Sequence, residues 1–265
     1  MESLAERKLR RKVVRYETDR LMREKRSEDM ESLEEVFDKS TLMIVYRLLN
    51  RGYIKNINGV VRSGKESRLY WGIGRGNKPV AIKIFLTTSA EFLKGRMMYI
   101  QGDERFKNTR KDTRSLVNLW ALKEFKNLQE AASAGIRVPT PFKVDGNVLL
   151  MEFIGRNGNP APLLRETPLD HPARVYDAIA EAVKRLYRKA QLVHGDLSEY
   201  NIMIVNLEPV IFDFAQAVPI EHPMAHQFLE RDLLRMNEYF SRIGVTVPPI
   251  ERLTKWVTGE NVDAD

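Results

Sequence analysis

The first part of the chain changes from a helical pattern of apolar residues to a strand pattern. Between Ser40 and Gly52 apolar residues recur every three or four positions, with a capping serine at the start and a terminating glycine at the end, so we expect a short helix. Residues 58–85 read instead as three strands, separated by a glycine-containing loop at 63–67 and a glycine-rich turn at 74–77. The pattern predicts a small antiparallel sheet.

A long helix and one more strand follow this sheet. Residues 115–134 carry a helical pattern that ends at Gly135, and the apolar run at 147–155 reads as a strand, entered in extended conformation through the prolines of 138–142. After a glycine- and asparagine-rich stretch at 152–158, apolar residues return at helical spacing in three segments, residues 172–190, 225–243 and 250–258. We therefore predict an α+β fold of two lobes, the second mainly helical.

These patterns divide the chain into three parts. Residues 1–40 mix charges of both signs with few apolar positions, which is typical of a solvated helix or a partly disordered arm. Residues 41–153 would form an N-terminal lobe with the sheet and its helices. Residues 154–265 would form the C-terminal lobe.

Composition excludes several classes of protein. Of the 265 residues, 43% are hydrophobic and 30% are charged, as in folded soluble proteins, and no apolar run approaches the roughly 20 residues that span a bilayer. The absence of cysteine excludes disulfides, thiolate metal sites and thiol nucleophiles. Because the charged N-terminus lacks the apolar core of a secretory signal, we expect a cytoplasmic protein without a membrane segment.

The excess of basic residues makes anionic partners plausible. A formal charge of +7 and a pI near 9.5 suit a nucleotide or RNA, although a merely soluble basic surface has the same charge. The cluster RKLRRK at 7–12 could contact RNA or be a solvated face. Residues 91–114 are polar and charged, and between residues 96 and 126 there are eight Lys or Arg against four acids. We expect a long mobile loop over 91–114.

The glycine-containing loop is close to a known phosphate-binding pattern without matching it. GVVRSGKES, residues 59–67, has Glu66 where the pattern G-x-x-x-x-G-K-[ST] requires a hydroxyl, and the residues that follow alternate like a strand instead of opening a helix. A glycine turn between strands can still lie over the phosphates of a nucleotide, with backbone N–H groups and Lys65 supplying positive potential. An ordinary hairpin turn is the alternative.

The third predicted strand contains a lysine. In VAIK, Lys83 shares a strand face with Ala81, and because an unpaired buried ammonium is very costly it needs an anionic partner. Glu124 is the candidate, since it lies on an otherwise apolar stripe of the long helix. Kinase motifs contain the same tetrapeptide, with the lysine paired to nucleotide phosphates and a helix glutamate. The alternative is a lysine that reaches solvent from an edge strand, with Glu124 paired to a helix lysine.

Polar residues interrupt an apolar stretch at 193–204. VHGDLSEYNIMI places Asp196 and Asn201 five positions apart, where burying polar groups without a purpose is costly. Phosphoryl transfer needs a carboxylate near the attacking hydroxyl and oxygen ligands for magnesium. Asp196 and Asn201 have the spacing of the kinase catalytic loop, and Asp213, after the apolar run PVIF, would be a second metal ligand.

Two histidines also stand close together. His222 and His226 lie four positions apart beside Glu221, which could suggest a metal site. Pro223 lies between them and no third ligand is evident, so we expect a histidine pair on the surface at a helix start.

Taken together, the motifs resemble the RIO family of atypical serine protein kinases. The matching stretches are RSGKES, VAIK, WALKEFKNL, MEFIG, LVHGDLSEYNIM and IFDFAQAV, over roughly residues 40–245. Within the family the chain is similar to the archaeal and eukaryotic branch that lacks an N-terminal winged helix. The resemblance implies a two-lobed protein-kinase-like fold, ATP with Mg²⁺ or Mn²⁺, and serine autophosphorylation. It also implies a role in late maturation of the small ribosomal subunit, whose precursor RNA would be a partner.

The resemblance further implies tasks for individual residues. Asp196 would be the catalytic aspartate, Lys83 would hold phosphates and Glu124 would orient that lysine, while Asn201 and Asp213 would bind the metal. The other nucleotide contacts would come from the glycine loop and from the hinge between the lobes: Ser63, Gly64, Lys65, Met151, Glu152 and Ile154. The hinge backbone from Glu152 to Ile154 would bind the adenine, and Met151 would guard its pocket.

The chain departs from ordinary protein kinases at several positions. Ser198 stands where their catalytic loop has a lysine, and Ala215 stands where they have the glycine of D-F-G. No A-P-E motif follows Asp213, and the helical pattern resumes by about Ala225. Because no room remains for a long activation segment, we do not expect efficient turnover of ordinary peptide substrates.

Two other functions remain open at this point. HGDLSEYN is also similar to small-molecule kinases of the aminoglycoside and choline type, although residues 214–265 are short for their helical substrate subdomain. The non-catalytic alternative is a ribosome-assembly factor that uses its nucleotide site as a conformational switch.

Two finer expectations concern where the phosphate goes. Asp213 is expected to accept it transiently, because a carboxylate beside a metal-bound γ-phosphate is a competent nucleophile; the protein would then be a slow ATPase. The alternative is that Asp213 binds metal only. The segment 91–115 would carry the autophosphorylation site among Thr109, Thr113 and Ser115, with Ser115 first because the family uses serine.

Overall fold

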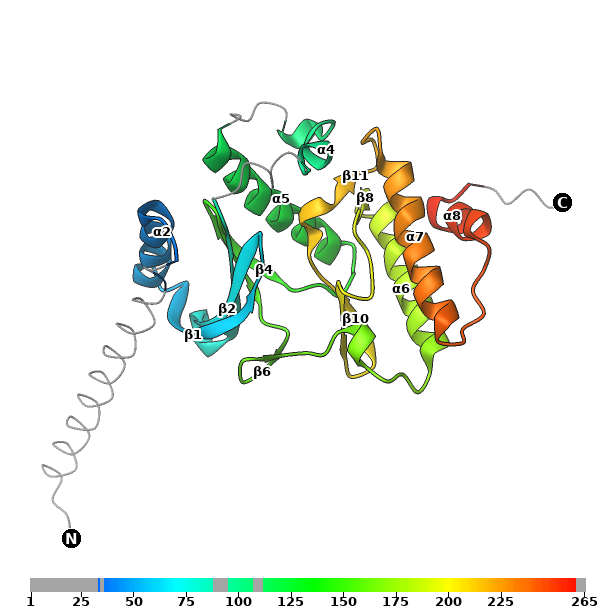
Figure 1. The fold of residues 1–265 in the computed structure, drawn as a ribbon, viewed down its shortest axis with the longest axis horizontal. Helices are drawn as coiled ribbons and strands as arrows, with labels where there is room; N and C mark the ends of the chain where they lie inside the picture. Colours follow the sequence, from blue (N-terminus) through cyan, green and yellow to red (C-terminus); the bar gives the residue numbers. More distant parts are fainter. Residues whose placement is uncertain (1–32, 34–35, 88–94, 107–111, 261–265) are drawn as a thin grey trace, which may run out of the picture.

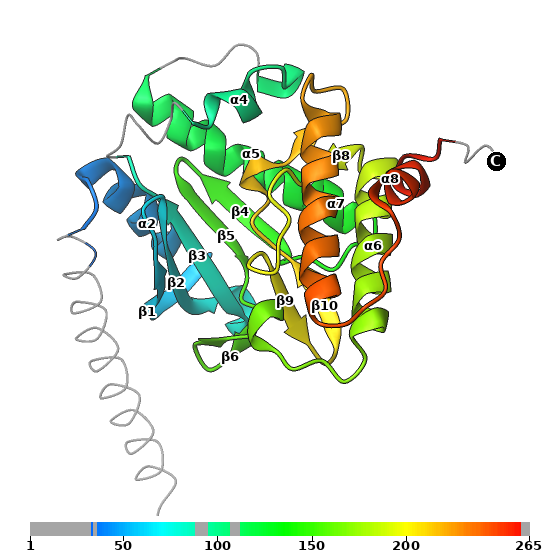
Figure 2. The same ribbon diagram turned by 45° about the vertical axis from the view of Figure 1, so that its right-hand side comes forward.

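The N-terminal lobe is built on a five-stranded antiparallel sheet. The fold is that of a computed structural model, which describes residues 33, 36–87, 95–106 and 112–260. The strand order is β1–β2–β3–β5–β4; Figure 1 shows the sheet beside α2 and α5, and Figure 2 labels its five strands. The strands are β1 (Ile54–Ser63), β2 (Ser67–Gly74), β3 (Pro79–Phe85), β4 (Pro141–Asp145) and β5 (Val148–Glu152). The three strands predicted over 58–85 are confirmed, although the first begins earlier, at Ile54.

Alternation along β3 gives this sheet two buried faces. Val80 and Ile82 belong to an apolar cluster with α2 (Lys39–Asn50). Ala81 and Phe85 belong to the larger core, which includes α5 (Thr113–Ser133) and the C-terminal lobe. Because side chains two positions apart share a face, Lys83 lies on the side of Ala81, toward α5, as the sequence predicts. The sheet thus separates a supporting helix from the site.

Helix α2 is capped by a different residue from the one expected. Asp38 is the N-cap, and its Oδ1 accepts hydrogen bonds from the backbone N–H groups of Ser40 at 3.0 Å and Thr41 at 3.1 Å. Burial opposes ionisation of Asp38, but hydrogen bonds from Arg114 and Thr41 outweigh it and lower its pKa to about 2. The prediction of Ser40 was wrong because both residue types cap helices well, and the carboxylate is additionally favoured by the helix dipole.

The apolar run at 147–155 is the second arm of a hairpin. The extended entry expected over 138–142 leads into β4, an edge strand that starts at Pro141, where a missing N–H is tolerated. In the turn between β4 and β5, the buried Asn147 amide donates to Phe85 O at 2.7 Å and to Thr41 Oγ1 at 3.0 Å. The turn is thereby tied to both β3 and α2.

Part of the segment expected to be a mobile loop is regular structure. Helix α4 (Met97–Ile100) and a 3₁₀ turn (Glu104–Phe106) lie within it, and Tyr99 and Phe106 are buried. Residues 88–94 and 107–111, which include Thr109, lie outside the described residues.

The start of α5 contains two of the expected phosphorylation sites. Asp112 caps the helix by accepting the backbone N–H of Ser115 at 3.0 Å. Thr113 and Ser115 therefore lie in the first helical turn and not in a loop. Thr113 is exposed, whereas Ser115 is half-buried.

The C-terminal lobe is mainly helical, as predicted. Helices α6 (Pro172–Arg188), α7 (Ala225–Arg242) and α8 (Ile250–Thr258) pack against one another (Figures 1 and 2). The segments that connect the helices contain short antiparallel strand pairs: β6 (Gly155–Arg156) with β7 (Asn159–Pro160), β8 (Leu192–Val193) with β11 (Val218–Pro219), and β9 (Ile202–Val205) with β10 (Glu208–Ile211). Helix α7 begins at Ala225, where the sequence pattern places it.

The helices of this lobe are amphipathic. In α6 the residues Val175, Ile179 and Val183, which carry the predicted helical spacing, are buried. Within the part of the chain that the structure describes, no helix is both long and apolar enough to cross a membrane.

Candidate functional site

Lys83 lies between two carboxylates from different lobes. Its Nζ is 2.8 Å and 2.7 Å from the two carboxylate oxygens of Glu124 on α5, and 2.9 Å from Oδ1 of Asp213, which follows β10. The lysine side chain is 12% exposed and that of Glu124 only 1%, whereas 43% of the Asp213 side chain is exposed. The structure contains the predicted Lys83–Glu124 pair and adds Asp213 to it.

The charges around Lys83 favour its protonated form. Burial opposes the charge of Lys83, but Asp213 and Glu124 outweigh it and raise the pKa of the lysine above its ordinary value. Burial would raise the pKa of Asp213, yet Lys83 outweighs it, so this pKa is lowered and the carboxylate is ionised at neutral pH. Burial raises the pKa of Glu124 to about 7, although Lys83 opposes this. Above that pH one ammonium between two carboxylates leaves a negative charge, which attracts a divalent metal ion.

The segment 194–201, which we call the aspartate loop, is fixed by α7. The buried carboxylate of Asp232 accepts the backbone N–H of Gly195 at 2.7 Å and that of Leu197 at 2.9 Å. Arg231 donates to the carbonyl of Gly195. Gly195 has a φ of +77°, and a Cβ at this position would lie 2.9 Å from Gln216 O. The loop is therefore held on both sides of Asp196.

Asp232 was missed in the sequence, although a signal existed. It lies four positions after Phe228 and four before Met236, both buried, and so it interrupts an apolar helix stripe just as Glu124 does. Burial raises the pKa of Asp232 to about 7, although hydrogen bonds from Leu197 and Gly195 favour the charged form.

Donors from three elements surround the carboxylate of Asp196. Arg235 on α7 donates through Nη1 to Oδ1 at 2.8 Å, and Gln216 donates through Nε2 to Oδ2 at 3.3 Å. Asn201 donates through Nδ2 to the Asp196 carbonyl at 2.8 Å and lies 3.4 Å from Oδ2. Asp196 and Asn201 are thus adjacent, as their spacing predicts. Because Gln216 lies in the turn that follows Asp213, the two predicted aspartates are linked through it.

Asp213 has an uncommon backbone conformation. Its φ of 64° and ψ of 61° are left-handed, which is strained for a residue other than glycine and occurs often at functional sites. Neighbouring contacts hold it: His194 Nε2 is 3.1 Å from Phe212 O, the His194 and Phe214 rings are 4.7 Å apart, and Asn127 donates to Phe214 O at 2.9 Å. The histidine of the loop therefore supports the backbone around Asp213 and does not face solvent.

The predicted phosphate loop is a hairpin loop between β1 and β2. Ser63, Gly64 and Lys65 are exposed, and Gly64 N–H donates to Ser67 O at 3.0 Å. A strand follows the loop, in agreement with the exclusion of the helix-opening pattern.

Arg96 joins this loop to the site and was missed in the sequence. It was counted among the basic residues of a mobile loop, but its side chain is buried, lies over the ring of Trp120 at 5.0 Å, and forms an ion pair with Glu66. Burial lowers its pKa to about 10, although the nearby Asp213 and Asp196 favour its charge. A single arginine in a charged segment carries no periodic signal that could have identified it.

The predicted hinge residues lie where β5 leaves the sheet. Met151 is buried and pairs with Ala81 of β3. The Glu152 carboxylate pairs with Arg137, and its backbone N–H donates to Thr140 O at 2.8 Å. The carbonyl of Ile154 accepts from Ala161 at 2.9 Å. An adenine would therefore use other backbone groups of the hinge.

His222 is buried, so the prediction of a surface pair is wrong for this residue. Its Nε2 is 2.7 Å from Gln101 O, just after α4, and its ring stacks on Phe228 with centroids 5.9 Å apart. His226 is exposed, as expected. His222 serves to join the two lobes.

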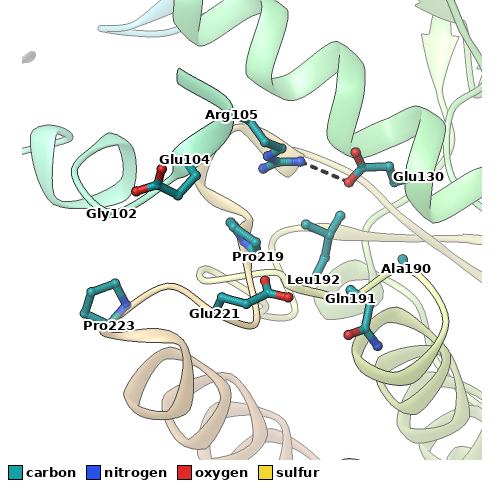
Figure 3. Close-up of a pocket in the computed structure, with 10 residues that line it drawn as sticks. All are labelled: Gly102, Glu104, Arg105, Glu130, Ala190, Gln191, Leu192, Pro219, Glu221 and Pro223. Carbon is teal, nitrogen blue, oxygen red and sulfur yellow. Dashed lines mark hydrogen bonds and ion pairs between the residues drawn. The ribbon is translucent and has the colours of Figure 1, made fainter. Parts of the chain in front are cut away.

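A pocket of about 520 Å³ opens beside this contact, between the lobes (Figure 3). On one wall Arg105 pairs with Glu130 at 3.0 Å and with the buried Asp103 at 2.8 Å. The residues that line the pocket do not include Lys83 or Asp213, so it is separate from the site.

The donor set at the site fits magnesium. Mg²⁺ is usually bound by one or two carboxylates together with substrate phosphates. Asp213 is ionised and partly exposed. Because the side-chain nitrogen of Asn201 donates to the Asp196 carbonyl, its side-chain oxygen points away from that carbonyl. Among the described residues no group of three His, Cys, Asp or Glu is suited to a metal, so phosphate oxygens and water would complete the coordination.

Comparison with known sequences gives matches along almost the whole chain. A model of the RIO domain matches residues 68–253. The RIO-type serine/threonine-protein kinase Rio1 of Haloferax volcanii is 38% identical, over 98% of this chain and 89% of its own. The protein of the same name from Methanocaldococcus jannaschii is 37% identical, over 94% and 84%. Human serine/threonine-protein kinase RIO1 is 37% identical, but the chain spans only 43% of its length.

Solved structures share the fold. Rio2 kinase from Chaetomium thermophilum, in a complex with ADP/Mg²⁺ and phosphoaspartate, matches with a TM-score of 0.63 and 23% identity, over 83% of this chain and 67% of that one. At this identity the likeness concerns the fold alone.

Proposed function

We propose a function from one premise: the chain belongs to the RIO family of atypical kinases. Archaeal relatives named serine/threonine-protein kinases are 37% and 38% identical over nearly the whole chain, and the chain is a kinase with a two-lobed α+β fold. We infer that it transfers the γ-phosphate of ATP to serine or threonine with Mg²⁺ or Mn²⁺. The observation that carries this inference is Lys83 held by Glu124 and Asp213 at 2.7 to 2.9 Å.

The proposal assigns a task to each side chain of the site. Lys83 holds phosphate oxygens, and Glu124 keeps its ammonium in place. Asp196 takes the proton of the acceptor hydroxyl as the new oxygen–phosphorus bond forms. Asn201 and Asp213 would hold the metal ion, which neutralises charge on the phosphates when bound.

Replacing Asp196 separates transfer from binding. Asp196→Ala removes the proton acceptor but leaves Lys83 and its partners, so we expect transfer from γ-labelled ATP to serine or threonine to fall by roughly 100-fold or more with ATP affinity retained. Asp170→Ala, an exposed aspartate outside the site, is the matched control. Normal transfer by the Asp196 variant would refute the assignment.

We further propose that Asp213 accepts the phosphate transiently. A carboxylate oxygen attacks the γ-phosphorus, the bond to the β–γ bridging oxygen breaks and ADP leaves; water then hydrolyses the acyl phosphate and restores the carboxylate. Support comes from the partly exposed, ionised state of Asp213 and from the phosphoaspartate in the Rio2 complex. Hydroxylamine cleaves an acyl phosphate but spares phosphoserine. Label that resists it fully would leave Asp213 as a metal ligand only.

The cellular setting is also a proposal. We infer a cytoplasmic protein that autophosphorylates and acts on the precursor of the small ribosomal subunit; the basic charge of the chain and the kinase relatives support this. The first turn of α5, with Thr113 and Ser115, is the proposed autophosphorylation site, because phosphate is favoured at a helix N-terminus. Phosphate found only elsewhere after incubation with ATP and Mg²⁺ would exclude this turn.

A further inference from the structure

A pocket of about 770 Å³ opens beside Asp196, between the aspartate loop and α7. The loop contributes two acidic side chains to it, Asp196 and Glu199, together with Ser198. Helix α7 contributes a third acid, Glu238, and both basic side chains, Arg235 and Arg242. The positive charge in this pocket therefore comes from the helix and not from the loop.

This distribution matters because of Ser198. At this position the catalytic loop of ordinary kinases has a lysine, so in this chain the loop has no cation of its own to place near the reacting groups. Phosphoryl transfer brings an anionic phosphate close to the anionic Asp196, and fixed positive charge at that point is a major source of rate enhancement. A cation must therefore come from a neighbouring element of the fold.

Arg235 is placed to supply this cation. Its Nη1 is 2.8 Å from Oδ1 of Asp196, and both side chains are partly exposed, at 40% and 33%. Arg242 pairs instead with Glu199 at 3.2 Å and is 68% exposed. Ion pairs with this much exposure contribute little to folding stability. The Arg235–Asp196 contact is thus better explained by its place on the carboxylate than by stabilisation of the fold.

The helix backbone that carries Arg235 is also fixed to the aspartate loop. It lies one helical turn after Arg231 and Asp232, which bind the backbone of the aspartate loop at Gly195 and Leu197. The helix and the loop therefore move together, and the guanidinium stays within reach of Asp196.

We propose that Arg235 is a positioning residue for phosphate transfer, which orients and neutralises Asp196 from α7 in place of a loop cation. The inference rests on the proposed kinase function. The acceptor hydroxyl takes over Oδ1 from Arg235 and gives its proton to the carboxylate. Its oxygen bonds to the γ-phosphorus while the bond to the β–γ bridging oxygen breaks, and ADP leaves with that electron pair. Arg235 keeps its charge beside the carboxylate during this exchange.

Charge and shape at this position can be separated by two variants. Arg235→Gln removes the charge, and Arg235→Lys keeps it. Arg185→Gln is the matched control, because it removes an arginine of similar exposure from a helix-surface ion pair, 3.1 Å from Glu181. For each protein the single-turnover rate of transfer from γ-labelled ATP, the ATP affinity and the melting temperature are measured.

We expect Arg235→Gln to slow transfer by roughly 10- to 100-fold, with ATP affinity and melting temperature equal to those of the control, and Arg235→Lys to restore most of the rate. A Gln variant within about twofold of the wild type would overturn the inference. Equal losses of rate, ATP affinity and melting temperature in both Arg235 variants would show a merely structural contact and overturn it as well. A wild type that transfers no phosphate while binding ATP would overturn the proposed function and this inference together.

Discussion

Lys83 is the cation that compensates the buried carboxylate of Glu124. The side chain of Glu124 is only 1% exposed, so its carboxylate depends on the lysine for compensation. Lys83→Met keeps the apolar stem but leaves Glu124 buried without its cation, and we expect a loss of about 3 kcal/mol in the free energy of unfolding. Urea unfolding at neutral pH measures it.

A second substitution tests the reason for that loss. Lys83→Met combined with Glu124→Gln removes both charges, so the double variant should regain much of the stability that the single one loses. Lys65→Met, in the exposed glycine loop, is the matched control and should change stability by less than about 0.5 kcal/mol. A single variant as stable as this control would contradict the dependence of Glu124 on Lys83.

The residues that sequence reasoning found are those whose polarity contradicts their surroundings. Lys83 in an apolar strand and Glu124 on an apolar stripe require partners, and the structure supplies them. Arg96 escaped because its segment was interpreted as a charged loop, and Arg235 escaped because polar residues are expected on the exposed face of an amphipathic helix such as α7. Their contacts bridge distant segments, which no local pattern encodes.

The connection that follows α4 contacts the C-terminal lobe closely. Gly102, just after α4, has a φ of +97°, and a Cβ there would lie 2.7 Å from Pro223 and 3.2 Å from His222 of the other lobe. Gly102→Ala therefore adds a clash to the backbone strain, and we expect a loss of about 1–3 kcal/mol beyond the strain itself. Urea unfolding gives the value.

Gly76→Ala is the matched control for this prediction. Gly76 has a φ of +69°, but a Cβ added to it would meet no atom within 4 Å, so only the strain of about 1–2 kcal/mol should be measured. Equal losses for the two variants would show that α4 does not depend on its contact with the C-terminal lobe.

Helix α5 contains a buried lysine with a testable pH dependence. Lys123 is fully buried, and burial lowers its pKa from 10.5 to about 7, although Asp103 opposes this. Between those values the folded protein binds fewer protons than the unfolded chain, so Lys123 makes stability rise with pH over that range. Relative to Lys123→Met, the wild type should gain stability between pH 7 and pH 9 in urea unfolding. Parallel curves for the two proteins would contradict this.

At the scale of elements, the strongly periodic segments were predictable and the short ones were not. Helices α6, α7 and α8 and strands β1, β2, β3 and β5 follow from spacing alone. Strand β4 does not, because it starts at a proline, and the four residues of α4 are too few to show a period. Tertiary contacts, such as the one from His222 to Gln101, fix such short elements.

The whole molecule carries an excess of positive charge, and residues 1–30 contribute to it with ten Lys or Arg against seven acids. Residues 1–30 lie outside those the structure describes, so the RNA contact of the cluster at 7–12 remains a sequence prediction. Each neutralised phosphate releases counterions, so affinity for small-subunit RNA should fall with salt at a log–log slope of roughly −0.7 to −0.9 per contact. Removing residues 1–30 should flatten this slope, as should neutralising only the cluster at 7–12. An unchanged slope would place the contacts elsewhere.

The central claim is that the group around Lys83 and Asp196 transfers the γ-phosphate of ATP to protein, and the fate of that phosphate tests it most directly. In a single turnover with γ-labelled ATP and Mg²⁺, we predict that the label leaves ATP and appears on the wild-type protein and later as inorganic phosphate. With Asp196→Ala, the label on serine or threonine, which resists hydroxylamine, should be lost. Wild-type protein that binds ATP but leaves the label in it, or passes it only to a small molecule, would contradict the claim.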